Sequence, residues 1–171
     1  MQHWKEPDKR VILSGVERAE YPFSKTPGAI HELRDVLAQT MWDDVGVLRN
    51  EQAMRRGLSS IAGHREALLA MGVPDGDRRY NVTWHDWLNL QSLVDMSRVI
   101  TVSALARENS RGAHAREDFP EPGDLHSSCY TRVTADGDDI RLEMVPVKFN
   151  IVTPGKSLIT GEAGQPPKVA A

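Results

Sequence analysis

Four basic side chains lie close together in the sequence, where a long helical pattern ends. They are Arg107, Arg111, His114 and Arg116, and Gly112 lies among them. Glycine readily adopts the left-handed conformation that often follows the last turn of a helix, so we expect Gly112 to end that helix. Cations near a helix C-terminus also interact favourably with its dipole, by about 0.3–1 kcal/mol each.

This basic cluster suits two kinds of chemistry. In the first, the cations cap the helix and pair with the acidic residues that follow, Glu117, Asp118 and Glu121. In the second, the cluster binds an anion directly, because arginine together with histidine suits a carboxylate. Residue types alone leave both interpretations open.

Other reactive side chains give weaker patterns. Cys129 could act as a nucleophile or metal ligand with His114 or His126, but the spacing matches no metal-site template. A lone cysteine in an alternating strand is usually a small buried apolar residue, and we expect this of Cys129. Trp84 and Trp87 are expected to lie in the core or at an interface. The sequence therefore predicts no catalytic residue and no metal ligand.

Three amphipathic patterns predict the helices that position these residues. The first begins near Thr26, as N-cap, with Pro27 at the first helical position. The second spans about 50–71, with Asn50 as its N-cap, and the third about 83–109. Each carries an apolar stripe at helical spacing: Ile30, Leu33, Leu37 and Met41; Met54, Leu58, Ile61 and Leu68; Trp87, Leu90, Leu93, Val94, Ile100, Ala104 and Leu105. Short connections favour an antiparallel up-down-up bundle.

The segments on either side of the bundle differ from it. Residues 1–25 show no clear periodicity and are predicted as an N-terminal arm, in which residues 11–13 form one short strand or a docking segment. Residues 128–171 are predicted as a β-hairpin, with an Asp-Gly turn at 135–138, and an extended or disordered tail from Thr153. The predicted fold is mainly α, with the bundle over 26–127.

Composition excludes several classes of protein. The chain has 171 residues, is 40% hydrophobic and carries a net charge of −3, so it lacks the basic field that attracts nucleic acid. No apolar run reaches the ~18 residues that a membrane helix needs. The N-terminus does not resemble a secretory signal, so we expect a cytoplasmic location without membrane insertion.

Three segments resemble one enzyme family. Residues 110–114 (SRGAH), followed by Arg116, Asp118 and Pro120, resemble the S-R-G-A-H-x-R-x-D-x-P stretch of succinate dehydrogenase and fumarate reductase flavoproteins. Residues 41–49 and 144–148 are similar to further segments of that family, in the same order and with comparable spacing. Together the matches cover about residues 30–159, within the C-terminal domain of those flavoproteins.

The resemblance implies a domain that is inactive alone and packs against an FAD-binding subunit. Members bind FAD through a glycine-rich fingerprint, and this chain has no G-x-G-x-x-G, so we expect it to bind no cofactor itself. The implied partner carries the FAD, and a further candidate partner is an iron–sulfur subunit. The candidates for interface or supporting roles are Trp42, Asp43, Arg107, Arg111, His114 and Arg116.

Two features leave room for another interpretation. Relatives usually have glutamate immediately before the Ser-Arg-Gly stretch, whereas this chain has Asn109, a neutral amide that cannot form the same ion pair. The catalytic segments of the family are also missing, and the initiating Met suggests a separate gene or a deliberate truncation. We therefore expect either the small part of a split enzyme or, as the alternative, a helical interaction or assembly module without a redox role.

Overall fold

The computed structural model describes residues 6–137 and 139–156, which contain four α-helices, a 3₁₀ turn and four strands. The elements in chain order are α1 (Lys9–Glu20), η1 (Tyr21–Ser24), α2 (Ile30–Val45), β1 (Leu48–Arg49), α3 (Glu51–Ala70), α4 (Val82–Leu105), β2 (Ala115–Arg116), β3 (Cys129–Asp136) and β4 (Asp139–Pro146). The mainly helical fold with a C-terminal antiparallel strand pair is confirmed.

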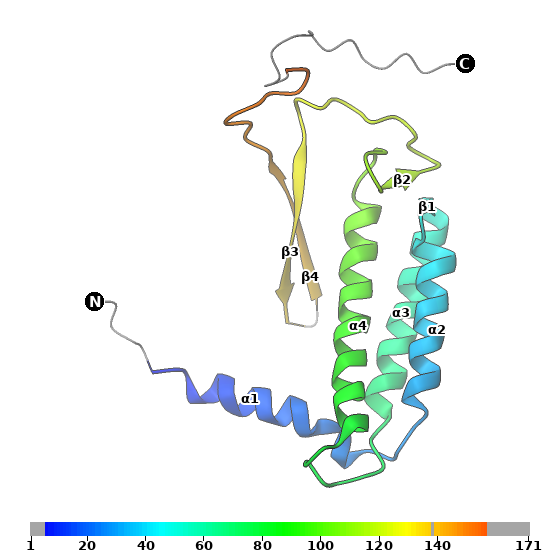
Figure 1. Cartoon of the computed structure of the whole chain (residues 1–171), viewed down its shortest axis with the longest axis vertical. Coiled ribbons are helices and arrows are strands. Elements are labelled where there is room, and N and C mark those ends of the chain that lie inside the picture. Colours follow the sequence, from blue (N-terminus) through cyan, green and yellow to red (C-terminus); the bar gives the residue numbers. More distant parts are fainter. Residues whose placement is uncertain (1–5, 138, 157–171) are drawn as a thin grey trace.

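Helices α2, α3 and α4 lie side by side and enclose the core (Figure 1). Trp87 is fully buried there, and its indole Nε1 donates to the carbonyl of Met71 at 3.0 Å. The other buried members of the cluster come from the predicted stripes and the loop after α3: Ile30, Leu33, Leu37, Ile61, Leu68, Val73, Leu90 and Val94. The core placement of Trp87 is confirmed.

Side-chain caps define the starts of two helices. Asn50 accepts a hydrogen bond from Ala53 N at 2.9 Å, which confirms the predicted start of α3. Asn81 accepts from Trp84 N at 2.9 Å, so α4 begins at Val82. It ends at Leu105, four residues before the predicted Asn109. Gly112 has the expected positive φ of 58°, but it lies in a turn beyond the helix and does not cap it.

The predicted start of α2 was wrong. Pro27 forms a parallel bridge with Gly72, and Gly72 N donates to the carbonyl of Thr26 at 2.7 Å. A side chain at Gly72 would clash with the carbonyl of Lys25, so the two segments lie in close contact. Because this contact uses the backbone around Thr26, the helix begins only at Ile30.

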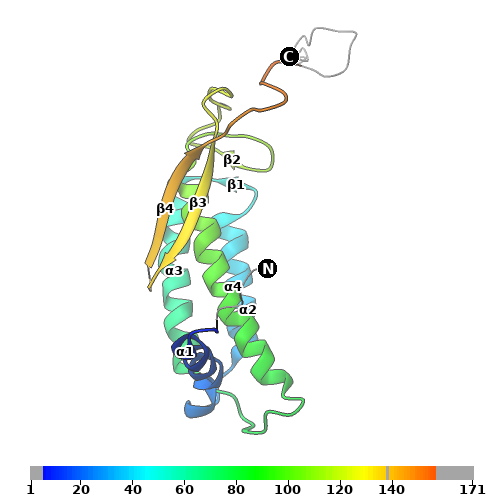
Figure 2. The ribbon, with the colours of Figure 1, turned by 90° about the vertical axis from the view of Figure 1, so that its left-hand side faces the viewer.

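The short strand considered for residues 11–13 was wrong, because these residues of the N-terminal arm lie in helix α1. The carboxylate of Asp8 caps this helix by accepting from Arg10 N at 2.9 Å. Its C-terminal end is held against the bundle, where Trp84 Nε1 donates to the carbonyl of Ala19 at 2.7 Å. The remainder projects from the base of the bundle (Figures 1 and 2).

The predicted β-hairpin is formed by β3 and β4. Asp136 pairs with Asp139 across the turn, and Gly137 has a φ of 62°. An ion pair of 3.5 Å between Arg98 and Asp139 links the hairpin tip to α4. Of the predicted tail, residues 157–171 lie outside the described part of the structure.

Membrane insertion was not expected from the sequence. Within the described residues, none of the helices combines the length and the apolar character needed to cross a membrane.

Candidate functional site

The guanidinium of Arg116 lies at the centre of the basic cluster, and only 1% of this side chain is exposed. Its Nη1 donates to the carbonyls of Ala104 at 3.2 Å, Leu105 at 3.1 Å and Arg107 at 3.1 Å. Carbonyls in the last turn of a helix have no partner within the helix, so this cation caps α4. The capping interpretation of the basic cluster is correct for Arg116.

Asp118 connects this cap to a second helix. Its carboxylate accepts from Arg116 Nε at 2.6 Å and Nη2 at 2.7 Å, and from the backbone N of Glu51 at 2.8 Å. The bonds from Arg116, reinforced by the one from Glu51, lower the pKa of Asp118 to about 2. One ion pair therefore places a cation at the end of α4 and an anion at the start of α3, the favourable position for each charge.

Two short strands bring these segments together. Leu48 pairs with Ala115 and Arg49 with Arg116 in a parallel ladder. Next to it, Asn50 Nδ2 donates to Glu117 Oε2 at 2.8 Å, and the N of Glu117 donates to the carbonyl of Arg49 at 2.8 Å. We call the residues 49–51 and 114–118 together the clasp.

His114 is the buried imidazole of the clasp. Its Nδ1 lies 2.9 Å from Arg49 Nη1, and its Nε2 lies 3.2 Å from the carbonyl of Arg107. Because a guanidinium only donates and a carbonyl only accepts, the ring is neutral, with its proton on Nε2. Burial, followed by the positive charges of Arg107, Arg49 and Arg116, lowers the pKa of His114 despite the opposing effect of its bond to the carbonyl.

Arg111 organises the loop that follows the clasp. Its backbone exchanges two hydrogen bonds with His114 around the tight turn at Gly112, of 2.8 and 3.1 Å. The guanidinium donates to the carbonyl of Pro122, to Ser128 Oγ at 2.7 Å and to the carbonyl of Asp124 at 2.9 Å. These contacts keep the loop closed over the end of the bundle.

The remaining candidates lie around the clasp with little contact between them. Arg107 is half-buried, and its Nη2 donates to Asn109 Oδ1 at 3.3 Å. Trp42 is 71% exposed near the end of α2, and the neighbouring Asp43 accepts from Gln39 at 2.8 Å. The structure thus joins His114 and Arg116 in one network, with Arg107 contributing its carbonyl, and leaves Trp42 and Asp43 on the surface.

Sequence reasoning did not single out two important members of the clasp. Arg49 reaches back to the carbonyl of Val45 at 3.0 Å as well as to His114, and so caps α2. Asn50 was recognised only as a helix cap, although its amide also binds Glu117. Arg49 ends the family-like segment 41–49 and Asn50 follows it directly, but only the tertiary pairing of β1 with β2 reveals their partners.

The hydrogen bonds of this network connect groups within the chain. Each nitrogen of the Arg116 and Arg111 guanidinium groups already donates to an acceptor of this chain, so an anion would have to displace those bonds. In the described residues, no group of three or more His, Cys, Asp or Glu side chains could hold a metal ion. Cys129 is exposed, and the expectation of burial was wrong, because a two-stranded hairpin leaves its end uncovered.

Comparison with known proteins identifies the family. Residues 34–158 match the family described as the fumarate reductase flavoprotein C-terminal domain. The chain is 35% identical over 130 residues to the succinate dehydrogenase flavoprotein subunit of Coxiella burnetii. This alignment covers 76% of this chain and 22% of that protein. It is 30% identical over 128 residues to the fumarate reductase flavoprotein subunit of Mycobacterium tuberculosis, over 74% of this chain and 22% of that protein.

Solved structures agree with this match. A quinol fumarate reductase chain from E. coli superimposes with a TM-score of 0.75 at 25% identity, over 94% of this chain and 28% of that one. The Sdh1 complex of Mycobacterium smegmatis has the same fold, with a TM-score of 0.78 at 22% identity, over 89% of this chain and 26% of the other.

The matched region is a minor part of each relative. This chain spans 22% of the length of the Coxiella protein and 22% of the Mycobacterium tuberculosis protein. The family match nevertheless covers most of this chain, including both segments of the clasp. The chain therefore belongs to the C-terminal domain family of the succinate dehydrogenase and fumarate reductase flavoproteins.

Proposed function

We propose that this chain acts as the C-terminal helical domain, or a small subunit, of an FAD-dependent oxidoreductase of the succinate dehydrogenase and fumarate reductase type. The FAD-binding part would carry out hydride transfer between a CH–CH bond and an alkene in a dicarboxylate-like substrate. This chain would bind no cofactor and would be inactive alone. The observation that carries the proposal is the family match over residues 34–158.

The geometry of the clasp supports a scaffolding role. Arg116 and Arg111 direct their donors to acceptors within this chain, and both nitrogens of His114 are occupied. Groups held in this way maintain the shape of the surface around them, which suits a domain that completes another. We therefore favour this role over direct binding of a dicarboxylate by the basic cluster.

The six candidate residues divide into two roles under this proposal. Trp42 and Asp43 lie exposed on α2, and we assign them contacts with the FAD-binding part. The other four support that surface from within or beside the clasp: Arg107, Arg111, His114 and Arg116.

The relatives also suggest the wider assembly. The solved matches include an Sdh1 complex and a quinol–fumarate reductase. We extend this to a hetero-oligomer with an FAD-binding flavoprotein, in which a further candidate partner is an iron–sulfur subunit. A cytoplasmic location stays a prediction, and none of the comparisons favours the alternative of an assembly module without a redox role.

The test is co-purification. The chain is tagged, expressed in its native source and recovered with whatever binds it, and the eluate is scanned for flavin absorbance. A flavin-bearing protein, identified by mass spectrometry as a flavoprotein subunit, is the expected result. Recovery of the chain without flavin, at a yield sufficient to detect equimolar partner, would refute the proposal.

A further inference from the structure

Helix α1 carries its apolar residues where its own bundle does not cover them. Val11, Ile12, Leu13 and Val16 are 70%, 51%, 61% and 48% exposed, and the helix buries none of its residues. A helix of 12 residues without a packed face is only marginally stable in water, so α1 requires a covering surface.

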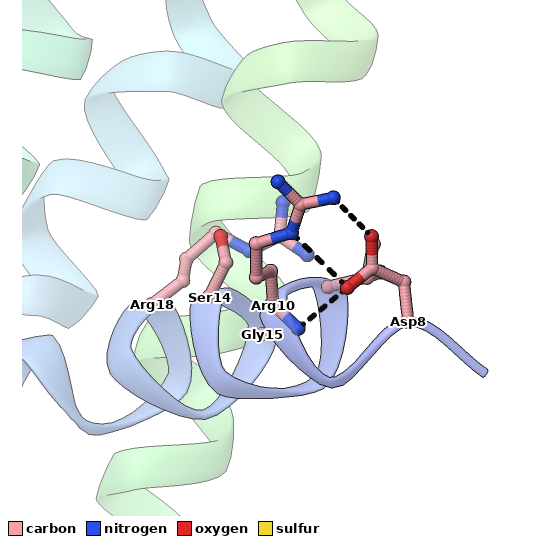
Figure 3. A pocket seen from close by; sticks show the side chains of 6 residues that line it. Asp8, Arg10, Ser14, Gly15 and Arg18 are labelled. Atoms are coloured by element: carbon pink, nitrogen blue, oxygen red, sulfur yellow. Dashed lines mark hydrogen bonds and ion pairs between the residues drawn. The ribbon is translucent and has the colours of Figure 1, made fainter.

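The side of α1 that turns towards the bundle is the polar one. Ser14, Glu17 and Arg18 line an open hollow of about 330 Å³ together with Leu69 of α3 and Gln91 of α4. Figure 3 shows Arg10, Ser14 and Arg18 along the same side of the helix, above the ribbon. With 100° per residue, Ile12 and Val16 lie on the opposite side of the helix from Ser14.

The position of α1 is defined despite this exposure. Trp84 Nε1 binds the carbonyl of Ala19, and Glu20 forms an ion pair of 2.9 Å with Arg78. The next residues continue into the core, where Pro22 is fully buried. The helix is therefore held at its C-terminal end and presents its apolar side away from the bundle.

The comparisons show how much of a related flavoprotein lies outside the matched region. A match that covers 94% of this chain has to include part of α1, and it accounts for only 28% of the E. coli quinol fumarate reductase chain. The remainder of such a flavoprotein is therefore available to pack on α1. A lipid surface fits less well, because Lys9, Arg10 and Arg18 are balanced by the carboxylates of Asp8, Glu17 and Glu20.

We infer that the apolar side of α1, formed by Ile12, Leu13 and Val16, is a docking surface for the FAD-binding part of the flavoprotein. The inference rests on the proposed function and adds to it a specific contact outside the matched residues 34–158.

The test compares two charge insertions on the same helix. The flavoprotein captured by the tagged wild-type chain is purified, and its affinity for Val16→Glu and for the control Ser14→Glu is measured. We expect Val16→Glu to weaken binding by at least about tenfold and Ser14→Glu to bind like the wild type. Circular dichroism melting should show both variants folded, because both side chains are exposed.

The other outcomes distinguish this inference from the proposed function. Wild-type affinity in Val16→Glu would overturn the docking surface and leave the proposed function intact. Failure of the wild-type chain to bind any flavoprotein would overturn both. The wild-type chain could also self-associate in sedimentation. If Val16→Glu abolished that self-association and left flavoprotein binding unchanged, the surface would be assigned to a second copy of this chain.

Discussion

At the scale of single residues, the buried cation Arg116 has the largest consequence for stability. Its removal takes the guanidinium donor away from the carbonyls of Ala104 and Leu105 and leaves the carboxylate of Asp118 with only the bond from the backbone N of Glu51. Breaking a buried ion pair typically costs 3–5 kcal/mol. Because 28% of the Asp118 side chain is exposed and water can partly replace the lost donor, we expect Arg116→Ala to cost about 3 kcal/mol in urea unfolding.

A surface ion pair provides the control for this measurement. Arg132 and Glu143 lie 3.2 Å apart on the hairpin, and both side chains are more than half exposed. Arg132→Ala should therefore change the free energy of unfolding by less than about 1 kcal/mol. Equal losses in the two variants would show that the clasp is open in solution.

His114 makes the stability of the clasp depend on pH. Its pKa in the folded state is lower than the ordinary value of 6.5, so the unfolded chain takes up this proton first. Stability should therefore fall as the pH drops below about 6.5 and through the lowered pKa. Asp118, with a pKa of about 2 in place of 3.8, adds a separate loss only in stronger acid.

A non-titrating side chain isolates the histidine contribution. Thermal melts of the wild type and His114→Gln are compared between pH 7.5 and pH 5, in steps of ~0.5. We expect the wild type to lose stability more steeply than the variant over this range. Parallel slopes would mean that another group is responsible.

Arg111 should matter more for association than for folding. Its guanidinium holds the loop from Pro122 to Ser128 and contributes nothing to the hydrophobic core of α2, α3 and α4. We predict that Arg111→Ala weakens binding of the flavoprotein by about tenfold while the melting temperature of the bundle changes little. A loss of melting temperature as large as that of Arg116→Ala would instead identify Arg111 as a structural cap.

At the scale of secondary structure, α4 depends on its N-terminal cap. Asn81 is buried, accepts from Trp84 N, and donates to the carbonyls of Asp75 at 2.9 Å and Asp77 at 2.8 Å. Asn81→Ala should cost about 1–2 kcal/mol, since it removes the cap and frees the loop. The matched variant Asn89→Ala, at an exposed position of the same helix, should cost nothing measurable in the same urea titration.

The helices that could be predicted from the sequence are those whose local signals agree with their packing. Asn50 caps α3 as expected, and the stripes of α2 and α3 are largely buried. In α4 the stripe was drawn too wide, since Leu93 and Ile100 are 49% and 44% exposed. Local preference could not show this, because burial depends on which neighbours reach that side of the helix.

Three features required tertiary information. Thr26 and Pro27 are typical of a helix start, but their backbone is used in the contact with Gly72. Residues 11–13 were predicted to form one short strand or a docking segment because residues 1–25 show no clear periodicity, whereas the structure places them in helix α1. In the clasp, the positive charge was recognised from the sequence, whereas the pairing of Arg116 with Arg49 and of Glu117 with Asn50, each across 67 residues, was not.

At the scale of the whole molecule, we propose that the described part of the chain serves as a scaffold for an FAD-binding part. We predict that the isolated chain neither retains added FAD on gel filtration nor reduces fumarate with a reduced dye as electron donor. The reason is that the guanidinium donors of Arg111 and Arg116 are already bonded to acceptors of this chain. Stoichiometric retention of flavin, or turnover above the rate without protein, would contradict this.

The clasp also sets an order in which the molecule can form. Residues 48 and 49 pair with 115 and 116, so the two-residue ladder closes a loop that contains α3 and α4. Closing this long loop lowers the conformational entropy of the chain, and only the contacts of the ladder and the clasp offset that loss. Helix α3 can pair with its neighbours α2 and α4 over shorter distances along the chain. The ladder should therefore close after the helices have assembled, and its side chains should act mainly on the rate at which the finished protein unfolds.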